Sequence, residues 1–251
     1  MFGVDDRQYV STAPGSPYSP VGQVKIRRTR ARATGTLISR CDVLTVEHAY
    51  GTFAPIFRDP RGDRVTFVGS VASKRSLTSE GTIIAAGGWR QPNPKVTAYV
   101  AYQLAEVFDN LGADWMIVRL DECLGDKLGW ATLITKTPGE WAIQQHVMDA
   151  GFPTDRNEKL GLSIDPDCAI QAFAPKALFH DCATMPGNSG GPIFRFVTVD
   201  GVQRMEILGI ISGAASYRHD LVAVPLTSNM ATAGWNVRYD GSHPYFFGEQ
   251  P

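Results

Sequence analysis

Short apolar runs rich in Val, Ile and Thr recur along the whole chain, and Gly, Pro, Asn or Asp separates each run from the next. Runs of this length and composition favour β-strands, and the residues between them favour turns. No segment has the sustained 3.6-residue period of a long amphipathic helix. The pattern therefore predicts an all-β fold, a sandwich or a barrel of short strands. The expected strands cover residues 21–32 as a hairpin, then 34–39, 43–49, 65–70, 81–86, 96–101, 115–118, 141–148, 168–173, 178–180, 192–197, 205–212 and 222–226, with a hairpin turn at 199–202.

The charge of the chain is balanced, with 24 Lys and Arg against 25 Asp and Glu and a formal net charge of −1. This balance gives no overall attraction to nucleic acid or to an anionic membrane. No apolar run approaches the roughly 18 residues that a membrane-spanning helix needs. We therefore expect no nucleic-acid partner and no membrane span. One basic segment lacks interleaved aromatic residues, so a solvated strand face explains it better than a nucleic-acid site; its residues are Lys25, Arg27, Arg28, Arg30 and Arg32.

A glycine-rich loop from Met185 to Pro192 is the clearest functional signal in the sequence. Gly187, Gly190 and Gly191 surround Ser189, and glycine lets a backbone turn tightly and direct several N–H groups to one point. Such a point can bind an oxyanion. A serine hydroxyl is a weak nucleophile by itself, so the loop has a chemical meaning only if a histidine base and an orienting carboxylate occur elsewhere.

Both partners are present, each beside an apolar run. His48 lies where the run 43–49 ends, and Asp114 directly precedes the run 115–118. Taken singly, each residue has an ordinary explanation, because a strand-end histidine is often structural, an aspartate before a strand is often a cap, and glycine-serine loops occur by chance. Their joint occurrence in the order His, Asp, Ser predicts a catalytic triad of His48, Asp114 and Ser189.

In this order and with these flanks, the three segments resemble the chymotrypsin-like serine peptidases, and most closely the bacterial V8-like, glutamyl-endopeptidase-type branch. The resemblance extends from about residue 5 to residue 235 of this sequence. It implies two antiparallel β-barrels with the active site in the cleft between them. Four further stretches carry it, namely Asp5-Asp6-Arg7, Pro17 to Gly22, Thr34-Gly35-Thr36 and Pro186 to Gly190.

The expected organisation follows the chain in four parts. Residues 1–20 contain four closely spaced Pro and Gly residues and should form an extended arm rather than a helix. Residues 21–122 form the first barrel, which contains His48 and Asp114, and residues 123–226 form the second, which contains Ser189. Residues 227–251 form a tail with a short helix over 227–236.

The resemblance implies a serine endopeptidase that acts through an acyl-enzyme. His48 takes the proton of Ser189 as the hydroxyl attacks a peptide carbonyl, and Asp114 orients the imidazole. The backbone N–H groups of Gly187 and Ser189 form the oxyanion hole. We expect a peptide or protein substrate and a monomer. Two alternatives stay open: a catalytically silent binding module with the peptidase fold, and an esterase that uses the same triad.

This chemistry requires no cofactor and no metal. The other histidines lack the spacing of a metal site such as His-Glu-x-x-His; they are His146, His180, His219 and His243.

The same resemblance implies a pocket for the residue before the cut. Its walls would be the segment Ala183-Thr184, the strand Ile211-Ser212-Gly213-Ala214 and the region around Asp220. Glutamate-cleaving relatives place a histidine where this chain has Ile211, and burying an unpaired carboxylate there would cost several kcal/mol. We expect an uncharged residue to be preferred and a basic one to come second, should Asp220 reach into the pocket.

Asn188 departs from the trypsin pattern. An aspartate at that position would form an ion pair with a newly freed α-amino group during zymogen activation. Asn188 has no anion to offer, so activity should not depend on a free chain terminus.

The four cysteines allow three pairings. Cys168 and Cys182 flank a hairpin that leads into the serine loop, so we expect a bridge there, which leaves Cys41 with Cys123. The alternative is four buried thiols in a cytosolic protein.

Disulfides favour an oxidising compartment, so we expect a secreted or periplasmic protein. Met1 is not followed by the charged and apolar regions of a signal peptide, so an exported protein would either have its signal outside this sequence or use another export route.

Overall fold

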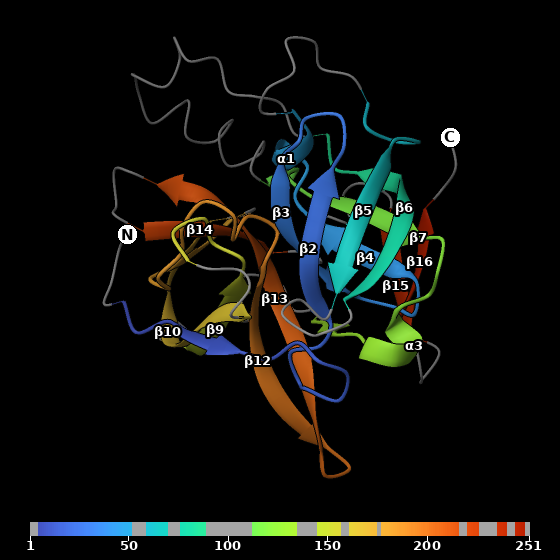
Figure 1. Ribbon diagram of the computed structural model, residues 1–251. Coiled ribbons are helices and arrows are strands. Elements are labelled where there is room, and N and C mark those ends of the chain that lie inside the picture. The colour runs from blue at the N-terminus through green and yellow to red at the C-terminus, as the bar shows by residue number, and fades with distance from the viewer. Residues whose placement is uncertain are drawn as a thin grey trace, which may run out of the picture.

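A computed structural model describes residues 5–51, 59–69, 76–88, 112–134, 145–156, 161–174, 177–215, 220–225, 235–239 and 244–248. Strands dominate these ranges, as the sequence predicts, and two barrels lie side by side (Figure 1). Among the described residues, no helix has the length and apolar character that crossing a membrane requires.

The first barrel is closed by six antiparallel strands. Alternate residues of β6 point inward, which places Ile83 and Ala85 in the core beside Phe67 and Trp115. The strands follow one another around the barrel in the order β2 (Val21–Ile26), β3 (Arg32–Leu37), β4 (Asp42–Thr45), β7 (Met116–Leu120), β6 (Leu77–Ala86) and β5 (Arg64–Gly69).

The second barrel is also a ring, because each of its six strands pairs with the next and the last pairs with the first. Its interior holds a separate apolar cluster that includes Val147, Ile170, Leu178 and Ile193. The two-barrel chymotrypsin-like architecture is therefore confirmed. The ring runs β9 (His146–Gly151), β10 (Leu162–Ala174), β11 (Ala177–His180), β14 (Asp220–Pro225), β13 (Val202–Ala215) and β12 (Pro192–Val199).

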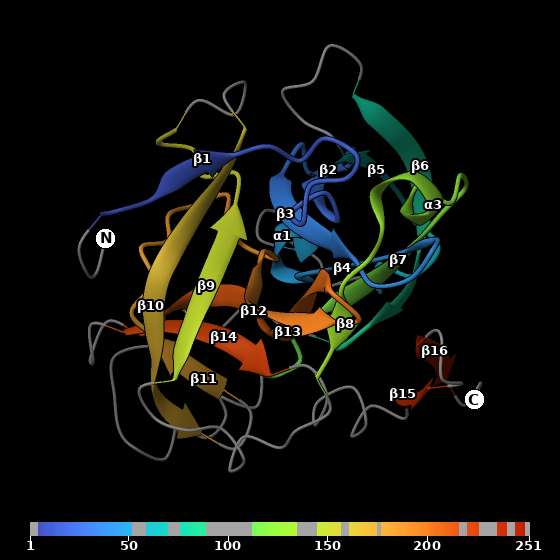
Figure 2. The same ribbon diagram turned by 90° about the horizontal axis from the view of Figure 1, so that it is seen from below.

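Two short strands extend this second sheet. β8 (Thr132–Leu133) pairs in parallel with β13, and β1 (Gln8–Val10) pairs antiparallel with β10. After β1 the chain crosses to the first barrel and enters β2 (Figure 2). The described part of the N-terminal arm is extended or in turns, and it connects the two barrels.

The hairpin between β12 and β13 turns at Asp200 and Gly201, as predicted. Both residues have positive φ, 52° for Asp200 and 75° for Gly201, and Val199 pairs with Val202. A two-residue turn with this backbone matches the twist of the strands, which is why Asp-Gly favours it.

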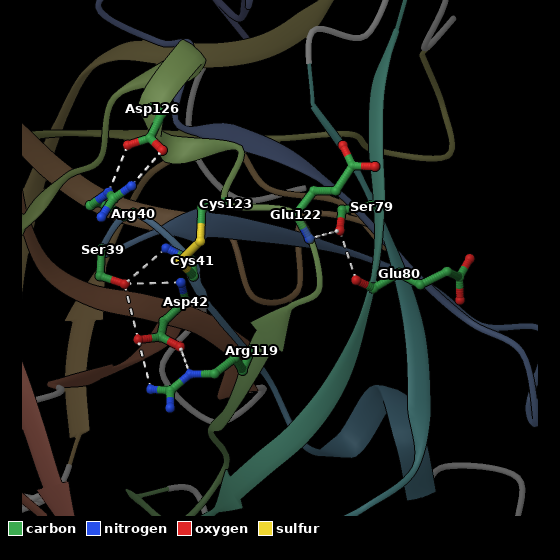
Figure 3. The surroundings of a disulfide bond; sticks show 10 residues. All are labelled: Ser39, Arg40, Cys41, Asp42, Ser79, Glu80, Arg119, Glu122, Cys123 and Asp126. Atoms are coloured by element: carbon green, nitrogen blue, oxygen red, sulfur yellow. Dashed lines mark hydrogen bonds and ion pairs between the residues drawn. A yellow bond between two sulfur atoms is a disulfide. The ribbon is translucent and has the colours of Figure 1, made fainter.

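Both expected disulfides are present. Cys41–Cys123 joins the turn after β3 to the segment before the one-turn helix α3 (Gly125–Leu128), and Cys168–Cys182 joins β10 to the segment after β11. Figure 3 shows the first bridge between two polar clusters, with Arg40 paired to Asp126 on one side and Arg119 paired to Asp42 on the other.

The predicted tail helix is wrong where the structure describes it. Residues 227–234 lie outside the described ranges, but Trp235 and Asn236 begin a strand, β15 (Trp235–Tyr239), that pairs with β16 (Pro244–Gly248). Trp, Val and Tyr in this segment favour a strand, and the partner strand supplies backbone hydrogen bonds that no local period reveals. The predicted strand 96–101 and residues 141–144 of another lie outside the described ranges.

Candidate active site

His48 and Asp114 meet because of the register of two neighbouring strands. Thr45, the last residue of β4, pairs with Met116, the first residue of β7. The chain leaving β4 and the chain entering β7 therefore lie at the same end of the barrel. His48 begins a one-turn helix, α1 (His48–Gly51), and its Nδ1 lies 2.6 Å from Asp114 Oδ2. The backbone N–H of His48 donates to the other carboxylate oxygen, at 2.7 Å.

Asp114 is fully buried, and a third donor reaches it from the second barrel. The Ser212 hydroxyl on β13 donates to Asp114 Oδ2, so the carboxylate accepts hydrogen bonds from both barrels. The sequence placed Ser212 only in the wall of the substrate pocket. Its contact with Asp114 depends on how the two barrels dock, and no local pattern could have revealed it.

The His48 ring remains partly accessible, since 20% of its side chain is exposed. Burial by itself lowers the pKa of His48. The charge of Asp114 and its hydrogen bond together outweigh that effect and raise the pKa above 6.5. Asp114 therefore stabilises the protonated form of the His48 ring.

The serine loop docks against strands of both barrels. Thr34 on β3 donates its N–H to the Ser189 carbonyl at 2.8 Å, and its hydroxyl donates to the Gly187 carbonyl at 2.8 Å. Gly190 donates its N–H to the carbonyl of Ile211 at 2.8 Å. Ile211 directly precedes Ser212, which binds Asp114, so these contacts bring half-buried Ser189 to the end of the first barrel where His48 and Asp114 lie.

At two glycines of this loop, any other residue would strain the backbone and require neighbouring backbone to shift. Gly187 has φ of 103°, and a Cβ there would come within 2.4 Å of the Phe152 carbonyl oxygen. Gly190 has φ of 82°, and a Cβ there would come within 2.3 Å of the Thr34 carbonyl oxygen. The sequence predicted a tight turn, and the structure adds that the backbone of neighbouring segments approaches closely at both positions.

The amide groups of the predicted oxyanion hole are free within the described part of the chain. There, the N–H groups of Gly187 and Ser189 donate to no protein acceptor, whereas the Asn188 N–H between them donates to the Met185 carbonyl at 3.0 Å. The Ser189 hydroxyl likewise has no hydrogen bond to a described residue, the His48 ring included. The contact of Ser189 with His48 stays a prediction.

The side chains of only some residues of the predicted substrate pocket are described. Ala183 is fully buried, Thr184 is 6% exposed and Ile211 is 4% exposed. Ile211 packs into the apolar cluster of the second barrel with Cys182 and Leu208. Three further residues are described in their backbone alone, with Gly213 and Ala214 paired to β14 and Asp220 paired to Ala215.

Two buried carboxylates behind the serine loop were missed by the sequence analysis. Asp149 on β9 and Asp165 on β10 are both buried, and the Asp165 N–H donates to Asp149 Oδ1 at 3.1 Å. Asn188 Nδ2 donates to Asp149 Oδ2 at 3.3 Å. Burial and the neighbouring Asp165 charge raise the pKa of Asp149 to about 8. An aspartate between the apolar residues Val147-Met148 and Ala150 of β9 was the available signal.

Neither a family model nor a curated protein matches the sequence. Solved structures do match the fold. One, described as a Glu endopeptidase in complex with MPD, has a TM-score of 0.61 and 14% identity, and the match covers 92% of this chain and 95% of that chain. Another, the Rv3671c protease in an inactive form, has a TM-score of 0.50 and 15% identity, with 86% and 89% covered. Both neighbours are proteases, and at these identities the likeness establishes the chymotrypsin-like fold.

Proposed function

We propose that the protein is a serine endopeptidase whose catalytic residues are His48, Asp114 and Ser189. The observation that carries the proposal is the 2.6 Å contact between His48 Nδ1 and buried Asp114, at the place where the serine loop docks. This contact leaves Nε2 of the same ring as the nitrogen that would face the nucleophile. The protease neighbours of the fold support the same class of reaction.

In this proposal the Ser189 hydroxyl attacks the substrate carbonyl while its proton passes to His48 Nε2. Asp114 keeps the ring in the required tautomer and stabilises the imidazolium, in keeping with the raised pKa of His48. The free N–H groups of Gly187 and Ser189 would stabilise the negative oxygen of the tetrahedral intermediate. His48 then returns the proton to the leaving amine, and water hydrolyses the acyl-enzyme by the same steps.

The substrate would be a peptide or protein chain. The two disulfides support an oxidising compartment, so we propose that the protein is secreted or periplasmic. An esterase with the same residues would differ only in the leaving group. A binding module without activity is disfavoured by the preserved His48–Asp114 contact, since a silent module does not need it.

A fluorophosphonate probe tests the proposal. It should attach to one residue, Ser189, and Ser189→Ala should abolish labelling. Ser39→Ala is the matched control, because Ser39 bonds to Asp42 in the first barrel and should not affect labelling. Folded wild-type protein that takes up no label, or that is labelled elsewhere, would contradict the proposal. Turnover of esters without turnover of peptides would favour the esterase.

A further inference from the structure

Arg7, in the N-terminal arm, is a permanent charge placed almost fully inside the protein. Its side chain is 1% exposed, and all three guanidinium nitrogens donate hydrogen bonds to carboxylates. Nε and Nη2 donate to the two oxygens of Asp5 at 2.8 and 3.0 Å, and Nη1 and Nη2 donate to the two oxygens of Asp155 at 3.2 and 2.7 Å. Only the guanidinium is buried, because Asp5 and Asp155 keep 35% and 30% of their side chains exposed. The cost of desolvating the guanidinium offsets much of the attraction between the charges, so the location of Arg7 suggests another role.

Asp155 belongs to a turn, Phe152 to Arg156, on which the serine loop rests. Thr154 donates its N–H to the Pro186 carbonyl at 2.8 Å. The Phe152 carbonyl oxygen occupies the position where a side chain at Gly187 would begin. This turn therefore touches the two residues that precede Asn188 and Ser189.

Thr34 closes the same contact from the first barrel. The Phe152 N–H donates to the Thr34 hydroxyl at 3.1 Å, and that hydroxyl donates to the Gly187 carbonyl at 2.8 Å. Gly187 is thus held between β3 and the Phe152 to Arg156 turn.

Arg156 fastens the other end of the turn to the arm. Its Nη1 donates to the Arg7 carbonyl at 3.1 Å and its Nη2 donates to Asp5 Oδ1 at 3.0 Å. Its guanidinium also lies 5.5 Å from the centre of the Tyr9 ring. Two arginines and two aspartates, one of each from the arm and from the turn, thereby fix these two segments together.

We propose that Arg7 is a positioning residue for the oxyanion hole. By holding Asp155, it fixes the Phe152 to Arg156 turn, and the turn fixes the orientation of the Gly187 N–H. Gly187 has no Cβ and adopts φ of 103°, so its own side chain cannot restrain the peptide. An oxyanion donor acts only if it is oriented before the charge develops. The inference rests on the proposed peptidase function, and it concerns a residue that touches neither the substrate nor the triad.

Kinetics of Arg7→Met, Arg7→Lys and Asp155→Asn test this role. Loss of one oxyanion donor lowers kcat by about 10²- to 10³-fold, so we expect Arg7→Met to lower kcat by about 100-fold with KM changed by less than about threefold. Arg7→Lys should recover part of the loss, and Arg7→Met combined with Asp155→Asn should be no worse than either change alone. Arg40→Met is the matched control. It removes a similar bidentate ion pair, in which Arg40 donates to the two oxygens of Asp126 at 2.7 and 2.8 Å, away from the serine loop.

Amide hydrogen exchange supplies a readout that does not need activity. In Arg7→Met, the amides of Thr154 and Asn188 should exchange at least about tenfold faster, while Val118 in β7 keeps its wild-type rate. Asp155→Asn preserves the shape of the side chain and serves in place of Arg7→Met should that variant fail to fold.

The outcomes are distinct. A lower melting temperature with wild-type kcat and wild-type exchange at Asn188 would overturn the positioning role and leave Arg7 as a structural residue. Failure of wild-type protein to react with the fluorophosphonate would instead refute the peptidase function, and the exchange rates would still decide whether Arg7 orders the serine loop.

Discussion

At the scale of single residues, the His48–Asp114 pair sets a testable pH dependence. In the proposed mechanism His48 must be neutral to accept a proton, and its pKa is raised above 6.5, so kcat/KM should rise with pH through a midpoint above 6.5. Asp114→Asn removes the charge that raises this pKa. We expect the midpoint to move to lower pH and kcat to fall by about 10⁴-fold, because the asparagine also favours the wrong tautomer.

Asp126→Asn is the control for that experiment, since it neutralises an exposed aspartate paired with Arg40. A midpoint that stays at the wild-type pH in Asp114→Asn would contradict the assigned role of Asp114. The measurement is a pH profile of kcat/KM with an ester substrate.

His180 gives a second prediction, on stability. It is fully buried, neither ring nitrogen has a hydrogen-bond partner within the described residues, and burial lowers its pKa to about 3. Between about pH 6.5 and 3 the unfolded chain binds a proton that the folded protein does not, so stability is lost as the pH falls through this range. We expect His180→Leu to reduce the loss of unfolding free energy between pH 7 and pH 4 by roughly 3 kcal/mol. Urea unfolding at both pH values measures it, and equal losses in the two proteins would refute it.

Ile211 carries the prediction on specificity. Its side chain packs among apolar residues, and a substrate glutamate placed against it would lose its hydration without gaining a partner. A peptide library should show that glutamate is disfavoured before the cut. In Ile211→His the preference for glutamate over an uncharged residue should rise by about tenfold, more at low pH where the imidazole is charged. Ile211→Leu is the control of similar volume, and a wild-type enzyme that prefers glutamate would refute the argument.

At the scale of elements, the two disulfides should differ in their contribution. Cys168–Cys182 joins residues 14 apart and Cys41–Cys123 joins residues 82 apart. In the chain-entropy model the bridges are worth about 3 and about 4.5 kcal/mol. Paired Cys→Ala variants should therefore unfold at lower denaturant concentrations, and the pair 41/123 should lose more. The opposite order in a guanidinium titration would show that factors other than loop length dominate.

At the scale of the whole molecule, the arm and the serine loop form one connected system. Arg7 in the arm binds Asp155 in the turn that contacts this loop, and the Asn188 side chain donates to buried Asp149. Adding a few residues before Met1 should therefore leave ester turnover within about threefold of the original, in contrast to enzymes that need a free terminus. Turnover that falls by orders of magnitude on extension, and returns on cleavage, would refute this.

Much of the fold was readable from local pattern. Side-chain alternation and turn residues are properties of neighbouring positions, so the strands around Phe67, Ile83 and Ile193 and the turn at Asp200-Gly201 were predictable. The tail was mispredicted at Trp235 and Asn236, since pairing with β16 outweighs a weak helical pattern. One-turn helices such as α1 are too short to produce a 3.6-residue repeat of apolar residues in the sequence.

The order of His48, Asp114 and Ser189 along the chain, together with the glycines around the serine, predicted a site of which the structure shows the contact between His48 and Asp114. Three features were decided by tertiary structure alone: the Ser212 hydroxyl on Asp114, the Asp149 carboxylate behind Asn188, and Arg7 bound to Asp155. Each joins segments far apart in the sequence, with separations of 98, 39 and 148 residues. Such contacts depend on strand register and on the docking of the arm and the two barrels, and these are set by the sum of many packing interactions rather than by any local run of residues.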